Sequence, residues 1–156
     1  MTSFPLLAPH KWRPLGAAWT IALLSSLAVL FVGEVMGQAP CDLCWFQRAF
    51  MFPLAIILGI AAFKSDRAVI PYGLALAAGG SLVALYHSLL YAGVIPAPIV
   101  PCTGGPSCSG ESMAIGGVPL PLLSLTAFAI ILILLLNFQR RLNSRPDESE
   151  WWPPSS

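Results

Sequence analysis

Two cysteines, Cys41 and Cys44, stand where a polar loop turns into an apolar segment. Thiols three positions apart can close a disulfide or form half of a metal site. Arg48 follows Cys44 by four residues, so on a helix the two side chains would share a face. A helix N-terminus and a guanidinium both favour thiolate over thiol. The spacing therefore favours a redox-active pair, with a structural disulfide or a metal half-site as the alternatives.

The other two cysteines, Cys102 and Cys108, form a second close pair. They lie in residues 94–120, a stretch with five prolines and five glycines that cannot hold a regular helix. A bridge between them would close a ring of seven residues. Loop-closure entropy for so small a ring contributes only roughly 2.4 kcal/mol. Exchange chemistry therefore explains such a bridge better than stabilisation of the loop does.

A metal centre is a further alternative for the four thiols, since two cysteine pairs can form a tetrahedral thiolate site. A Cys-x5-Cys spacing in a Pro/Gly-rich loop is unusual for such a site. Trp45 stands where the haem-attachment motif Cys-x-x-Cys-His requires histidine. We therefore predict no metal.

The composition places most of the chain in contact with lipid or protein rather than water. Of the 156 residues, 56% are hydrophobic and 10% are charged, and the mean hydropathy is +0.76. A soluble domain has about a quarter charged residues. The net charge of +1, with no basic cluster larger than Arg140-Arg141, gives no indication of nucleic-acid binding.

The uncharged runs predict an all-α membrane protein, a single domain built as a bundle of four transmembrane helices. A helix needs about twenty apolar residues to cross a bilayer, and the runs place the helices at about 15–35, 44–63, 69–92 and 121–139. Outer loops then cover about 36–43 and 94–120, and residues 140–156 form a tail. The second helix reaches full length only if it begins near Cys44, which puts Arg48 about one turn inside the membrane. Arg48 is then either a functional residue or an anchor that extends to the headgroups.

The distribution of charge predicts the orientation. Seven of the eight lysines and arginines fall in the two tails and in the loop after the second helix. Because cytoplasmic segments hold the excess of positive charge, we predict that both termini are cytoplasmic. All four cysteines then lie on the outer side, where disulfides form and persist.

His87 is the remaining conspicuous polar group in the apolar segments. It lies about six residues, or ~9 Å, from the outer end of its helix, a depth similar to that of Arg48. A lone histidine in an apolar helix is often only a packing residue. A cation and an imidazole at one depth, however, could together hold the carbonyl oxygens of a quinone dissolved in the membrane.

Taken together, three motifs resemble those of the DsbB-type disulfide bond formation proteins, in the compact, short-loop branch of that family. They are Pro40-Cys41-x-x-Cys44-Trp45-x-Gln47-Arg48, then Tyr86-His87, then Pro101-Cys102-Thr103-Gly104-Gly105. The resemblance covers roughly residues 15–140. It implies a multi-pass protein of the bacterial cytoplasmic (inner) membrane, a four-helix bundle whose redox loops face the periplasm or the exterior.

The resemblance also implies an enzyme, a thiol:quinone oxidoreductase that generates disulfides. Such an enzyme reoxidises a DsbA-like thioredoxin-fold protein and passes two electrons to ubiquinone or menaquinone. By position, Cys41 and Cys44 would be the quinone-coupled pair, with Cys44 donating electrons as a thiolate. Cys102 would form the mixed disulfide with the partner, and Cys108 would exchange with Cys41.

By the same resemblance Arg48, His87 and Gln47 would bind the quinone. The tight Cys102–Cys108 spacing and the short second outer loop depart from the best-known members of the family. Two other interpretations remain. One is a non-catalytic four-helix membrane protein with structural disulfides. The other is a quinone reductase like vitamin K epoxide reductase, although in that family the loop pair precedes the Cys-x-x-Cys motif.

Overall fold

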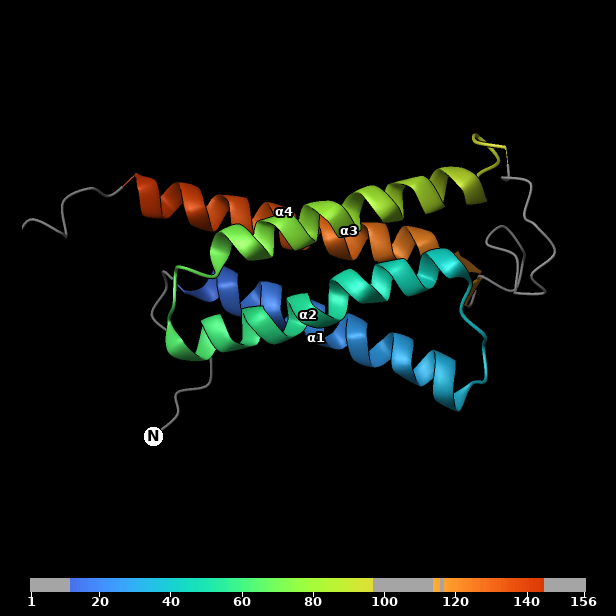
Figure 1. Cartoon of the computed structure of the whole chain (residues 1–156), viewed down its shortest axis with the longest axis horizontal. Helices are drawn as coiled ribbons and strands as arrows, with labels where there is room; N and C mark the ends of the chain where they lie inside the picture. The colour runs from blue at the N-terminus through green and yellow to red at the C-terminus, as the bar shows by residue number, and fades with distance from the viewer. Residues whose placement is uncertain (1–11, 97–113, 116, 145–156) are drawn as a thin grey trace, which may run out of the picture.

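Four long helices dominate the computed structural model, which describes residues 12–96, 114–115 and 117–144. They are α1 (Arg13–Leu30), α2 (Asp42–Lys64), α3 (Ile70–Tyr91) and α4 (Leu120–Asn143) (Figure 1). A π-helix, η2 (Phe31–Val35), extends α1, and β1 (Ala114–Ile115) pairs antiparallel with β2 (Val118–Pro119) just before α4. All four spans, counting α1 with η2 as one, are long and apolar enough to cross a membrane. The predicted four-helix membrane bundle is confirmed.

Local sequence explains where these helices begin and end. Proline occupies the first turn of α1, α3 and α4, where its missing N–H costs no hydrogen bond. Helix α2 begins directly after Cys41, whose extended backbone forms the N-cap. Its C-cap, Ser65, adopts a left-handed φ of 54°, and the turn to α3 follows. α4 ends at Asn143, beyond the predicted end at residue 139.

Each helix packs against its neighbours in the sequence, and α1 also packs against α4, which closes the ring of helices. Large buried side chains such as Leu54, Phe128 and Phe138 fill the centre. Gly80 of α3 faces Phe128 of α4 so closely that an added Cβ would overlap the phenyl ring. Small residues therefore allow these two helices to approach one another, as is common in membrane bundles.

The outer surface of the bundle is apolar. Leu24, Ile56, Leu82 and Ile133 are all exposed, each from a different helix. The start of α1 and the end of α4 lie at one end of the bundle, together with the turn between α2 and α3 (Figure 1). The start of α2 lies at the opposite end, so Cys41 and Cys44 sit there with the start of α4.

Candidate functional site

The first turn of α2 holds the cysteine pair. Cys41 is the N-cap residue and is 1% exposed, whereas Cys44 is half-buried. Their sulfur atoms are 3.3 Å apart, beyond the ~2.05 Å of a disulfide bond. Only a small movement therefore separates the two sulfurs from bonding distance.

His87 of α3 lies against this pair. Its side chain is fully buried, and its Nε2 is 3.9 Å from Cys41 Sγ. Its Nδ1 is 3.0 Å from the amide nitrogen of Gln47, which is also buried. The sulfurs of Cys41 and Cys44 and a ring nitrogen of His87 all lie within 4.8 Å of one another, so they could also act as ligands of one metal ion.

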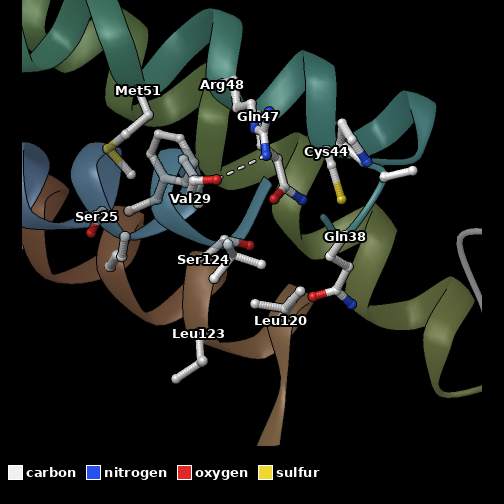
Figure 2. A pocket seen from close by; sticks show the side chains of 16 residues that line it. Ser25, Val29, Gln38, Cys44, Gln47, Arg48, Met51, Leu120, Leu123 and Ser124 are labelled. Carbon is white, nitrogen blue, oxygen red and sulfur yellow. Dashed lines mark hydrogen bonds between the residues drawn. The ribbon is translucent and has the colours of Figure 1, made fainter. Parts of the chain in front are cut away.

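Arg48 lies one turn further along α2 and points toward α1. Its Nη2 donates a hydrogen bond of 3.1 Å to the backbone oxygen of Val29, shown as a dashed line in Figure 2. Its guanidinium carbon is 5.3 Å from the ring centroid of Trp45, a cation–π contact. Gly33, in η2, leaves the space that the guanidinium occupies, because an added Cβ would lie 3.2 Å from Nη2.

A cavity of about 220 Å³ opens between α1, α2 and α4 beside these residues (Figure 2). Most of its walls are apolar side chains. The sulfur of Cys44 and the polar side chains of Gln47 and Arg48 reach it from α2, and Gln38 reaches it from the preceding loop. The remaining lining residues are Ser25, Ala28, Val29, Val32, Ala39, Pro40, Met51, Leu120, Leu123, Ser124, Ala127 and Phe128.

The structure brings together five of the residues singled out in the sequence, but in two groups. Cys44, Gln47 and Arg48 line the cavity, whereas His87 is not among its lining residues and lies beside Cys41 instead. The similar depth of Arg48 and His87 suggested a shared ligand. Depth along a helix does not determine which way a side chain points, and here the two point to different places. Cys102 and Cys108 lie outside the described residues.

Several contacts of the site were not found from the sequence. Val29, Gly33 and Gln38 surround Arg48 or line the cavity, yet none stands in a motif with the cysteines. Gly33 and Gln38 do stand out as a small and a polar residue in the apolar stretch before Cys41. Their spacing alone gives no reason to place them against Arg48.

Comparisons with known proteins agree on one family. The family model described as disulfide bond formation protein DsbB matches residues 11–138. A probable disulfide formation protein of Metapseudomonas resinovorans is 59% identical over 132 residues, which cover 83% of this chain and 92% of that protein. Disulfide bond formation protein C of Bacillus subtilis is 38% identical over 120 residues, 76% of this chain and 87% of the relative. No solved structure matches the chain.

Proposed function

The chain belongs to the DsbB family of disulfide bond formation proteins. On that premise we propose that it reoxidises a thioredoxin-fold protein that forms disulfides in other proteins, and that it passes the electrons to a membrane quinone. Family membership supports the formation of disulfides by a multi-pass membrane oxidoreductase. The quinone, the DsbA-like partner and the residue roles are the proposal.

The cavity beside Cys44 is the observation on which the quinone proposal chiefly depends. A quinone ring fits a site with apolar walls and hydrogen-bond donors for its carbonyl oxygens. The cavity has such walls, and Arg48 and Gln47 offer N–H donors beside the sulfur of Cys44. Leu123 of α4 lines the cavity and is 49% exposed, which supports entry of a quinone from the lipid.

Within this proposal the two thiols of α2 have different partners. Cys44 faces the cavity and is the electron donor, while Arg48 stabilises its thiolate and orients the acceptor. A quinone in the cavity supplies the capacity to take up two electrons and two protons. Cys41 faces away, toward His87, and exchanges with Cys108. Since Cys41 is 1% exposed, that exchange requires the start of α2 to open.

The proposed orientation follows from charge. Arg13, Lys64, Arg67, Arg140 and Arg141 lie near the helix ends opposite the cysteines. Positive charge marks the cytoplasmic side. We therefore place the protein in the bacterial inner membrane with both termini in the cytoplasm and the start of α2 facing the periplasm or exterior.

The test is reduction of a quinone by the purified full-length protein. A reduced thioredoxin-fold oxidant of the DsbA type is the donor, ubiquinone and menaquinone are offered in turn, and quinone absorbance is followed. We expect turnover with at least one quinone, and none with Cys44→Ser. No turnover with either quinone, from protein whose disulfides form normally, would contradict the proposal.

A further inference from the structure

His87 and Cys41 contact one another outside the set of residues that line the cavity, and we propose that His87 is a fixed hydrogen-bond donor to the Cys41 sulfur. In this proposal Gln47 selects the neutral tautomer of His87 with its proton on Nε2. That N–H then stabilises Cys41 whenever it is a thiolate. The inference rests on the proposed disulfide exchange and assigns His87 to Cys41 instead of the cavity.

The tautomer follows from the contact with Gln47. The amide nitrogen of Gln47 lies 3.0 Å from Nδ1 of His87. An amide NH₂ group only donates hydrogen bonds, so Nδ1 must accept and hold no proton. A neutral imidazole has one N–H, which must then be on Nε2. That nitrogen is the one 3.9 Å from Cys41 Sγ.

The three residues are buried, which makes a hydrogen-bond donor at Cys41 important for the stability of a thiolate there. His87, Gln47 and Cys41 are 0%, 7% and 1% exposed, so water cannot easily replace either of the two contacts that join them. A thiolate buried without hydrogen-bond donors is strongly disfavoured. Hydrogen bonds to charged groups are among the stronger ones, and a low-dielectric surrounding strengthens them further. A preset donor at Cys41 therefore offsets part of the cost of forming a thiolate there.

The proposed exchange contains a step that needs such a donor. Once Cys41 is joined to Cys108, the Cys102 thiolate attacks the Cys108 sulfur. The Cys102–Cys108 bond forms, the Cys41–Cys108 bond breaks, and the electron pair of the broken bond goes to Cys41. No proton moves, because Nε2 of His87 already holds one and only donates. His87 therefore acts as a stabiliser of the leaving thiolate and not as a general base.

The two thiols of α2 would then have separate supports. Arg48 lies one turn from Cys44 on the cavity side, and His87 lies beside Cys41 on the side of α3. Gln47 stands between the two, because it lines the cavity and also contacts His87. A change at Gln47 should therefore alter Cys41 through His87.

The first test is nitrogen-15 NMR of the histidine ring in the reduced full-length protein. The chain has two histidines, so a His10→Asn background leaves only His87. We expect the shifts of a neutral ring protonated at Nε2, and loss of this single tautomer in Gln47→Leu. A ring protonated at Nδ1, or a doubly protonated ring, would overturn the proposal.

The second test measures how much of Cys41 is thiolate. With Cys44, Cys102 and Cys108 replaced by serine, ultraviolet thiolate absorbance reports Cys41 alone. At one fixed pH we expect His87→Leu to lower the thiolate fraction about tenfold, with a smaller loss in Gln47→Leu. Ser88→Ala is the matched control, because Ser88 is buried on the same helix but bonds the backbone of Ala84. An unchanged thiolate fraction in His87→Leu would overturn the proposal.

Neither measurement includes a quinone or a partner protein. A protein that fails to reduce quinone but shows the Nε2 tautomer and the thiolate loss would contradict the proposed function while supporting the role of His87. A protein that reduces quinone but lacks the Nε2 tautomer and the thiolate loss would support the proposed function and contradict the role of His87 at Cys41. The tautomer measurement on the His10→Asn protein leaves His87 and Gln47 intact, so it tests the proposal even if His87→Leu or Gln47→Leu fails to fold.

Discussion

At the scale of single residues, the environment distinguishes two cysteines that the Cys-x-x-Cys motif presents as equivalent. Cys41 is buried beside His87, whereas Cys44 lines the cavity together with Arg48. A thiolate attacks or leaves according to the groups around it. Because their neighbours differ, the two sulfurs can take the two different parts that the proposed relay assigns to them.

Replacement of Arg48 is the sharpest test at this scale. Arg48→Ala removes the donors toward the cavity and also the hydrogen bond to Val29. We expect the quinone KM to rise about tenfold or more, the usual order for a lost hydrogen bond from a charged group. Arg48→Lys keeps the charge but loses the planar fork, so it should give an intermediate KM.

The measurement is steady-state quinone reduction with the thiol donor in excess. Arg67→Ala is the control, an arginine at the opposite end of the bundle that should leave KM unchanged. If Arg48→Ala also leaves KM unchanged, Arg48 is only an anchor at the membrane boundary and the quinone binds elsewhere.

At the scale of elements, the π-helix η2 is the feature that shapes the site. π turns widen a helix locally and recur at functional sites. Here η2 brings Gly33 against the guanidinium of Arg48, and the preceding turn offers the carbonyl of Val29. The position of Arg48 thus depends on α1 and η2 as much as on its own helix.

Gly33→Ala should displace Arg48. The new Cβ would lie 3.2 Å from Nη2, closer than side chains normally tolerate, so the guanidinium must move. We expect a rise in quinone KM smaller than that of Arg48→Ala, with little change in thermal stability. Val35→Ala, an exposed position in the same π-helix, is the control. Equal KM values for Gly33→Ala and wild type would show that Arg48 does not depend on this contact.

The close contact between α3 and α4 predicts an effect on stability and not on the quinone KM. Gly80→Ala would push a methyl group into the Phe128 ring, and overpacking of this kind costs about 1–3 kcal/mol. We expect a lower Tm, partly restored in the double variant with Phe128→Leu. Ser81→Ala, next to Gly80 but bonded to its own helix through Ala77, should change Tm little. A Gly80→Ala protein as stable as wild type would mean that α3 and α4 approach less closely.

At the scale of the whole molecule, the bundle separates a positively charged end from an end that holds the cysteines. The ring of four helices places α1, α2 and α4 around the cavity, while α3 supplies His87 from the other side. In the proposed relay, thiol exchange with a partner and electron transfer to the quinone would therefore take place on opposite sides of the first turn of α2.

Trapping in cells tests the exchange order across the whole molecule. In Cys108→Ala, a mixed disulfide at Cys102 cannot be resolved by its neighbour, so we expect a covalent complex with an extracytoplasmic thioredoxin-fold protein. Non-reducing electrophoresis and mass spectrometry would identify it. Cys102→Ala is the matched control and should trap no such complex. A complex with Cys102→Ala but not with Cys108→Ala would reverse the order.

The sequence by itself determined the properties that are local along the chain. Uncharged runs of sufficient length define the four spans, and the Cys41–Cys44 spacing indicates thiol chemistry. These inferences are possible because hydropathy and i to i+3 spacing depend only on nearby residues. The depth of His87 also followed from counting along its helix.

Only the tertiary structure decided which side chains meet. His87 contacts Cys41 and Gln47, which lie 46 and 40 positions away, and Arg48 contacts Val29, 19 positions away. Such contacts depend on the rotation of each helix about its axis. That rotation is set by packing such as Gly80 against Phe128, and apolar residues on every face of a membrane helix conceal it in the sequence. For the same reason, counting along the helix gave the depth of His87 but not its direction, and only the fold places its ring beside Cys41 and not among the residues that line the cavity.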